Sequence, residues 1–113
     1  AEKLSLVSEL WSPKVVAELN DYQVKVVQVE GEFVWHAHAQ TDELFLVIAG
    51  ELDIVMRERT VTLGAGELYV VKKADEHKPI ARGRCHLVLI EPSGVTNTGN
   101  ADERKSAPQN VWV

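Results

Sequence analysis

The sequence predicts an all-β fold in one domain, either a β-sandwich or a small barrel. Short runs of β-branched and aliphatic residues follow one another at close spacing through most of the chain, and glycines stand between many of them. Almost no stretch has helical periodicity. A chain of 113 residues can bury a core without disulfide or metal staples. We expect a single domain with a capping segment at 1–13, a β-barrel at 14–92 and a tail at 93–113.

The first segment predicts a short helical turn and then a hairpin. Apolar residues recur at helical spacing at Leu4, Val7, Leu10 and Trp11. Pro13 would end this turn, because proline disfavours helical backbone in the residue before it. The β-branched runs 14–19 and 22–30 follow. They are separated by Asn20-Asp21, a pair that tolerates the left-handed backbone of a tight turn.

The segment 33–38 predicts a strand with two different faces. Side chains alternate between the faces of a strand, so His36 and His38 point the same way. Phe33 and Trp35 then point the other way, toward the outside. We expect this aromatic surface to be covered, either by the N-terminal segment or by a second copy of the chain in a homodimer.

The rest of the chain predicts further strands and turns. Strands are expected at 43–49, 51–57, 60–63, 68–71, 77–81 and 85–91. The run 43–49 is apolar on both faces, which favours a central strand. Gly64-Ala65-Gly66 is the strongest turn signal, and Arg82-Gly83 predicts a hairpin. After Pro92 the chain is polar, and we expect Val111-Trp112-Val113 to dock the tail.

Charge and hydropathy exclude several classes of protein. The formal net charge of −5 argues against non-specific nucleic-acid binding, which needs clustered Lys and Arg. No apolar run approaches the roughly 20 residues that cross a bilayer, and the start of the chain lacks the uninterrupted apolar region of a signal peptide. We expect a cytoplasmic protein with no nucleic-acid or membrane partner. The single cysteine, Cys85, lies in an apolar run and is interpreted as core.

Two histidines and a carboxylate predict a metal site. His36 and His38 on one strand face can share a single ion. Glu43 follows five residues after His38, a spacing that lets the chain turn and bring a carboxylate beside them from a neighbouring strand. A mononuclear metal site inside a β-structure is therefore expected. His86 shares a strand face with aliphatic residues and is interpreted as structural.

Two motifs make the chain resemble the small single-domain cupins, a group often described as similar to mannose-6-phosphate isomerase. Their first motif is a glycine, an HxH pair, a glutamate and a second glycine. It matches Gly31, His36, His38, Glu43 and Gly50, with one residue fewer than usual before the first histidine. The second motif retains Gly66 and His77. It departs at three positions, where Lys72 replaces a proline, Ala74 a glycine and Ala81 an asparagine.

The resemblance implies a double-stranded β-helix, two antiparallel sheets rolled into a barrel, with a metal ion held by His36, His38, Glu43 and His77. Three neutral imidazoles and one carboxylate suit one divalent transition metal ion, which could be Fe, Mn, Ni, Zn or Cu. The motifs offer no thiolate, which argues against a closed structural zinc site. Four protein ligands around an octahedral ion leave two positions for water or a small-molecule substrate.

The sequence leaves two functions open. The first is a metal-dependent enzyme, an oxygenase, isomerase or lyase that acts on a small polar molecule. The second is a non-catalytic protein that uses the metal to bind or sense a small molecule, since no acid–base pair beyond the ligands can be picked out. A sugar-phosphate isomerase would need a ring of basic residues at the pocket, and the sequence shows no such constellation.

Residues near the ligands have two interpretations each. Gln40 and Asp42 either orient the imidazoles or lie in a solvated loop. Lys72 and Lys73 either attract an anionic substrate or belong to a solvated turn. The following residues either line a pocket or fill the core: Phe45, Val47, Met56 and Tyr69.

Overall fold

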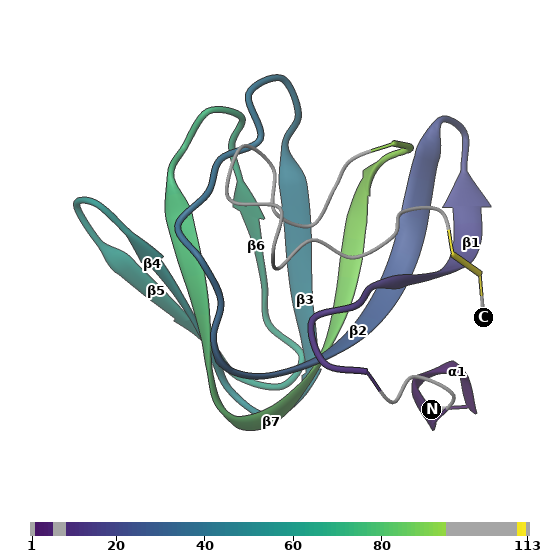
Figure 1. Ribbon diagram of the computed structural model, residues 1–113, viewed down its shortest axis with the longest axis horizontal. Coiled ribbons are helices and arrows are strands. Elements are labelled where there is room, and N and C mark those ends of the chain that lie inside the picture. The colour runs from purple at the N-terminus through teal and green to yellow at the C-terminus, as the bar shows by residue number, and fades with distance from the viewer. Residues whose placement is uncertain (1, 6–8, 95–110, 113) are drawn as a thin grey trace.

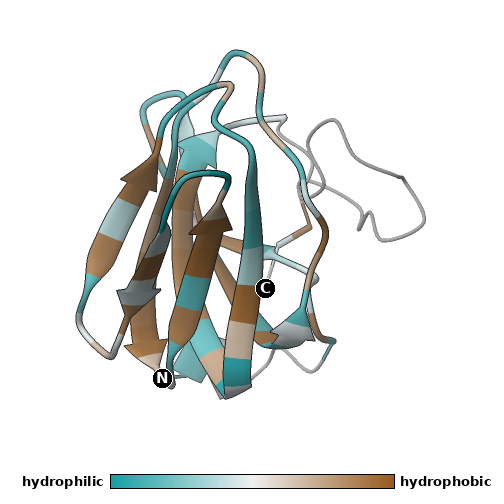
Figure 2. Cartoon of the chain, turned by 90° about the vertical axis from the view of Figure 1, so that its left-hand side faces the viewer, coloured by the Kyte–Doolittle hydropathy of each residue, from teal (hydrophilic) through white to brown (hydrophobic). Residues whose placement is uncertain are grey.

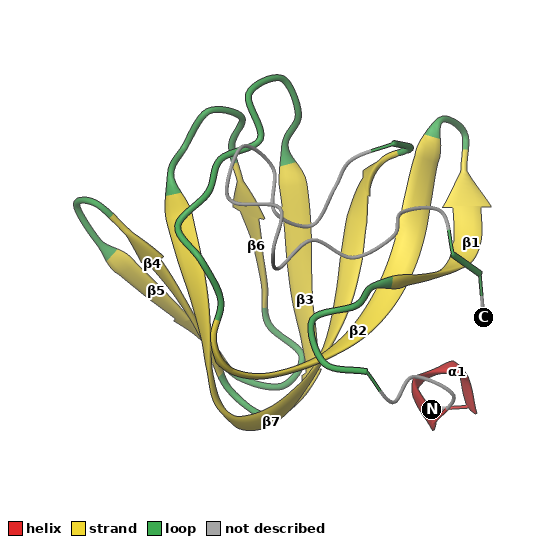
Figure 3. Cartoon of the chain, in the orientation of Figure 1, coloured by secondary structure: helices red, strands yellow, loops and turns green. Residues whose placement is uncertain are grey.

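The computed structural model describes residues 2–5, 9–94 and 111–112, and almost all of the regular structure in this part is β-strand, as the sequence predicts (Figure 3). The elements are α1 (Glu2–Ser5), β1 (Lys14–Leu19), β2 (Tyr22–Glu32), β3 (Glu43–Ala49), β4 (Leu52–Met56), β5 (Thr60–Leu63), β6 (Leu68–Val71) and β7 (His77–Pro92). No helix among the described residues is long and apolar enough to cross a membrane.

The strands form one antiparallel sheet that rolls around a core. The order β1-β2-β7-β3-β6 makes one part of the sheet, and β4 joins it by pairing with both β7 and β5. The β1–β2 pair lies at one side of the molecule and the β4–β5 hairpin at the other (Figure 1). β3 pairs with β6 and β7 on its two edges, which confirms it as a central strand.

The long strand β7 corrects one prediction. The predicted hairpin at Arg82-Gly83 is wrong, because the strand continues through both residues. Its two halves pair with the same neighbour, β2, through Gly31 opposite Ala81 and Val29 opposite Cys85. The intervening residues form an irregularity in the ladder rather than a reversal of the chain.

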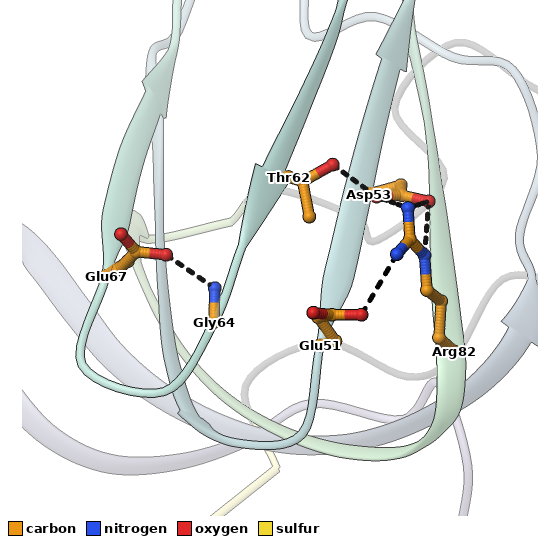
Figure 4. A network of polar contacts seen from close by, with 6 residues as sticks. All are labelled: Glu51, Asp53, Thr62, Gly64, Glu67 and Arg82. Carbon is orange, nitrogen blue, oxygen red and sulfur yellow. Dashed lines mark hydrogen bonds and ion pairs between the residues drawn. The ribbon is translucent and has the colours of Figure 1, made fainter.

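Charged side chains hold the irregular part of β7 against β4 (Figure 4). The backbone N–H of Arg82 donates a hydrogen bond to the carbonyl of Glu51 at 3.1 Å. Its guanidinium group donates to the carboxylates of Asp53 and Glu51 at 3.0 Å. Asp53 also accepts a hydrogen bond from the hydroxyl of Thr62 on β5, so this network joins three strands.

The segment 33–38 is a second correction, because it is not a strand. Only His36 pairs, in a single bridge with His77. Because this segment is not pleated like a strand, its side chains do not alternate regularly between two faces. The expectation that Phe33 faces outward is therefore wrong. Its side chain is buried and stacks on Trp11 with 4.7 Å between ring centroids, so the predicted cover from the N-terminal segment is present. The guanidinium carbon of Arg57 lies 3.8 Å over the centre of the Trp35 ring.

The helical turn at the N-terminus is shorter than its spacing predicts. Within the described residues α1 ends at Ser5, and Val7 lies outside them. Leu10 forms a bridge with Gln28 of β2, and Trp11 has a φ of 57°, so neither residue is helical. At the other end, the carbonyl of Val111 accepts a hydrogen bond from the backbone of Val15 on β1 at 2.7 Å. This contact confirms that the residues near the C-terminus dock on the barrel.

The core lies between the two parts of the rolled sheet. Inward positions alternate with outward ones along the strands, as in β4, where Leu52, Ile54 and Met56 are buried as predicted. Cys85 is fully buried, which confirms it as core. Figure 2 shows hydrophobic residues on the strands and hydrophilic residues at many of the connecting loops.

Gly50, in the turn between β3 and β4, is required both by its backbone conformation and by its neighbours. Its φ is 93°, and a Cβ atom there would lie 2.6 Å from the carbonyl oxygen of Arg84 and 2.9 Å from the Cα of Cys85. Gly66 offers a matched control, because its φ is 85° but no atom lies within 4 Å of an added Cβ.

We expect Gly66→Ala to lower the free energy of unfolding by about 1 kcal/mol, which reflects backbone strain offset by lower chain entropy in the unfolded state. Gly50→Ala should lower it by about 1–3 kcal/mol more, because the backbone of β7 must also shift. Urea unfolding of both variants measures the difference. Equal losses would show that the backbone of β7 does not constrain Gly50.

Candidate metal centre

The four residues of the predicted metal site come together in the structure. His36 and His38 lie in the segment before β3, Glu43 is the first residue of β3, and His77 is the first residue of β7. All four are buried, with exposed fractions of 7% or less. One ligand atom from each lies within 4.8 Å of all the others, so the group could hold a metal ion.

Backbone hydrogen bonds fix this arrangement. The N–H of His36 donates to the carbonyl of His77 at 3.0 Å, and the N–H of His77 donates back to the carbonyl of His36 at 2.9 Å. The carbonyl of His38 accepts a hydrogen bond from the N–H of Ala74 at 2.8 Å. The irregular segment with two of the histidines is thus tied to β7 and to the turn before it.

The hydrogen bonds made by Nδ1 of two imidazoles leave their Nε2 atoms available to bind a metal ion. Nδ1 of His36 lies 2.9 Å from the carbonyl oxygen of Val34, and Nδ1 of His77 lies 3.0 Å from that of Asp75. A proton on each Nδ1 makes these contacts hydrogen bonds and leaves Nε2 as a bare acceptor. The imidazoles are therefore oriented by backbone carbonyls.

Two buried nitrogen atoms support the fit of a metal ion. Nε2 of His38 and Nε2 of His77 are buried without a hydrogen-bond partner, at 3.3 and 3.8 Å from Oε1 of Glu43. Ligands about 2.1 Å from a common ion stand roughly 3.0–3.4 Å apart when they are adjacent in octahedral or tetrahedral geometry. The 3.3 Å separation falls in this range and the 3.8 Å separation is slightly wider, and the donor set of three imidazoles and one carboxylate suits one divalent ion.

Burial keeps His36 in the form that can bind a metal. Its pKa is lowered from 6.5 to about 4, mainly by burial and next by the nearby His77. The imidazole is neutral at neutral pH, and only a neutral imidazole can ligate.

A second buried acid and a buried lysine stand behind Glu43. Burial alone raises the pKa of Glu43, but a hydrogen bond with Glu91 and the close imidazoles of His38 and His77 hold this pKa well below its usual range. Burial and the neighbouring Glu43 raise the pKa of Glu91 to about 9, so Glu91 carries a proton at neutral pH and donates it to the Glu43 carboxylate. The other side of Glu91 accepts a hydrogen bond from the ammonium group of Lys25 at 2.8 Å.

Sequence reasoning missed Lys25 and Glu91, although a signal was present. Lys25 stands in register with the inward residues Val27 and Val29 on β2, and it is 3% exposed. Glu91 stands in the same register as the inward Leu89 on β7, and it is 1% exposed. A charged residue in phase with a buried strand face indicates a paired group inside the barrel.

The turn that departs from the cupin motif keeps its shape. Ala74, which replaces a glycine, has a φ of 66°, the left-handed conformation that glycine favours. Asp42 accepts a hydrogen bond from the backbone N–H of Lys73 at 2.8 Å, and its other oxygen lies 3.7 Å from the ammonium group of Lys72. These two contacts of Asp42 anchor the turn, and Gln40 is exposed.

A cavity of about 360 Å³, including its part open to solvent, reaches the four-residue cluster. His36 and Glu43 are the only cluster members that line it. Its other described walls are apolar side chains from β2, β3, β7, the segment before β1 and the segment between β2 and β3. Phe45 lines the cavity, whereas Val47 and Met56 fill the core. Tyr69 packs beside the core, and its hydroxyl accepts a hydrogen bond from Arg59 at 2.9 Å.

The rolled antiparallel sheet with a buried His/His/Glu/His group defines a small β-barrel protein with a possible metal centre. The family described as cupin domain matches residues 23–91, which is more than half of the chain, and the chain belongs to this family. Uncharacterized protein YdbB of Bacillus subtilis is 36% identical over 77 residues, which cover 67% of this chain and 68% of that protein.

Solved structures confirm the double-stranded β-helix. A cupin-2 domain containing protein from Shewanella frigidimarina is 56% identical, with a TM-score of 0.79 over 80% of this chain and 89% of that chain. Protein NMB1881 from Neisseria meningitidis is 29% identical, with a TM-score of 0.75 over 81% of this chain and 94% of that chain. Both similarities extend over most of the barrel.

The lowered pKa of His36 predicts a pH dependence of stability in metal-free protein. Unfolded His36 takes up a proton near pH 6.5, while the folded protein resists protonation down to about pH 4. The unfolded state then binds more protons, so stability is lost as pH falls through this window. The shift corresponds to about 3 kcal/mol.

Urea unfolding at several pH values, with a chelator present, measures this effect. The free energy of unfolding of the native chain minus that of His36→Gln should fall by about 3 kcal/mol between pH 7 and pH 4. Glutamine does not titrate, so the subtraction removes the contributions of other groups. A difference that stays constant with pH would contradict the burial of a neutral imidazole.

Proposed function

We propose that His36, His38, Glu43 and His77 bind one divalent transition metal ion, and that the protein acts through this ion on a small molecule. The observation that supports this most directly is the pair of buried Nε2 atoms on His38 and His77 beside the Glu43 carboxylate. Burying such groups without a partner is costly, and a shared cation would satisfy them together. When bound, a divalent ion supplies Lewis-acid or redox chemistry.

The cavity favours one of the reaction classes that the sequence left open. An isomerase or a lyase generally needs a positioned acid or base beside its substrate. Among the residues that line the cavity, only His36 and Glu43 are titratable, and both belong to the proposed ligand set. An oxygenase draws its reactivity from the metal rather than from an acid–base pair, so oxygenase is the preferred activity.

The same observation supports a second candidate function, a non-catalytic binding or sensing protein. A metal held by four buried ligands can anchor a small molecule without reacting with it. Oxygen uptake by the metal-loaded protein in the presence of a bound molecule distinguishes the two functions.

We also propose a homodimer in the cytoplasm, as expected from the sequence, but with a different contact surface. Phe33 and Trp35 are covered within one chain, so they no longer support the dimer. The outward face of the sheet supports it better. Cross-strand partners there form two aliphatic rows across β2, β7, β3 and β6: Val24, Ile90, Leu44 and Val70, then Val88, Leu46 and Leu68, the second row starting from the buried Val26. An outward sheet face exposed to water is usually polar.

Freshly purified protein should contain about one divalent ion per chain. His77→Ala should weaken metal binding by more than about tenfold. Even loss of a residue that only hydrogen-bonds a metal ligand lowers metal affinity roughly 10- to 100-fold. His86→Ala is the matched control, since His86 lies outside the cluster and should keep the ion. Elemental analysis after dialysis measures both. Full occupancy in His77→Ala would remove His77 from the ligand set.

Sedimentation should give twice the chain mass at micromolar concentration. Val88→Lys places a charge in the middle of one aliphatic row and should yield monomers. Val55→Lys on β4 is the control, because Val55 is also partly exposed but lies outside both rows. A dimer that withstands Val88→Lys would place the contact elsewhere, and a monomeric native chain would refute the dimer.

A further inference from the structure

We propose that the cavity beside the metal cluster binds a compact, flat and largely apolar molecule that presents oxygen atoms to the ion. This inference rests on the proposed metal function and specifies its ligand. It replaces the small polar molecule that the sequence alone suggested. Three features support a flat and largely apolar ligand. They are the walls of the cavity, its aromatic side chains and the two proposed metal ligands that it reaches.

Among the described residues, the lining side chains with hydrogen-bonding groups are those of His36, Glu43 and Trp11. The remaining lining side chains are aromatic, aliphatic or proline. The indole N–H of Trp11 is directed to the carbonyl of Glu30 at 3.1 Å. A polyhydroxylated molecule would leave several buried hydroxyls unpaired, each at a cost of about 1–3 kcal/mol. A sugar is therefore a poor fit.

Aromatic rings form the path to the cluster. Trp11 and Phe33 stack with an angle of 15° between their planes, and the edge contact between Phe33 and His36 has a centroid distance of 5.5 Å. Phe45 makes an edge contact with His77 from the other side. Flat apolar ligands pack favourably against such rings, in stacked or edge-to-face geometry.

The backbone conformation of Trp11 is strained, and two hydrogen bonds hold the residue in that conformation. Its φ of 57° is uncommon for a bulky residue and costs energy. Its backbone N–H donates to the carbonyl of Gln28 at 2.9 Å, and its indole N–H contacts Glu30. Strain of this kind, kept at the wall of a cavity, is consistent with a residue that shapes a binding site.

The cavity reaches the cluster on one side only. His36 and Glu43 line it, whereas His38 and His77 do not. A molecule in the cavity therefore meets the ion past His36 and Glu43. With four protein ligands in place, the positions left for a ligand suit neighbouring oxygen atoms on a flat ring.

Binding of two chelating probes tests the inference. 4-Nitrocatechol is a flat aromatic ring with two adjacent hydroxyl oxygens and a nitro group, while malate offers carboxylate and hydroxyl oxygens on a flexible polar chain. The metal-loaded protein should bind 4-nitrocatechol at least tenfold more tightly than malate in equilibrium dialysis. Trp11→Ala should weaken 4-nitrocatechol binding about tenfold and leave the metal content unchanged. Trp112→Ala should have no effect, because Trp112 lies outside the cavity.

A second arm separates failure of this inference from failure of the proposed function. 4-Nitroanisole cannot chelate, so its binding to metal-stripped protein reports on the cavity alone. 4-Nitroanisole should bind the native chain, and its binding should be lost in Trp11→Ala. Binding should also be lost in Trp11→Leu, a variant that keeps an apolar side chain but no aromatic ring. Absence of metal from the native protein would overturn the proposed function but not the cavity result. Equal binding of malate and 4-nitrocatechol, or unchanged binding in both Trp11 variants, would overturn the inference.

Discussion

The antiparallel pairing of β7 with three other strands is the constraint on which the rest of the structure depends. Its first residues pair with β4, its later residues pair with β3, and β2 runs beside both parts. One strand thus connects the two parts of the sheet and closes the core between them. The same pairing places His77, at the start of β7, beside His36, and the ligand atoms of both lie within 4.8 Å of that of Glu43. The metal cluster is therefore a consequence of how the sheet rolls, since its members are brought together by backbone hydrogen bonds.

The interior of this barrel holds more ionisable groups than a core of its size tolerates without compensation. Glu43, Glu91 and Lys25 are each at least 96% buried, and isolated charges in that environment are costly. The chain of contacts from Lys25 through protonated Glu91 to Glu43 offsets part of this cost and holds the Glu43 carboxylate in its charged form. A charged carboxylate beside three imidazoles is a strong site for a cation, and the cavity next to it is lined mostly by apolar side chains. The surroundings of the cluster thus favour both metal binding and an apolar ligand.

Two sequence predictions failed for the same physical reason. The alternation of faces in 33–38 and the turn-forming pair Arg82-Gly83 are both local signals, and tertiary contacts overrode both. The segment 33–38 is held by one bridge to β7, which leaves its side chains free of a strict period and brings Phe33 to the wall of the cavity with His36. Arg82 contacts the carboxylates of Glu51 and Asp53, and the strand continues through Gly83, whose φ is 77°, as an irregularity in the ladder rather than a reversal. Ala74 is the opposite case, because hydrogen bonds from the surrounding chain hold an alanine in the conformation of the glycine it replaces.

The sequence by itself determined the all-β class, the positions of most strands and the four residues of the cluster, because strand periodicity and motif spacing are local properties of the chain. Only the tertiary structure showed that Lys25 and Glu91 support Glu43, that Trp11 and Phe33 form the wall of a cavity, and that His36 and Glu43 alone face it. These contacts join residues far apart in the chain, and they depend on how the sheet curves. The HxH pair and its glutamate indicated a metal site from the start. What the rolled sheet added is the apolar space beside that site, from which we infer the kind of molecule that it binds.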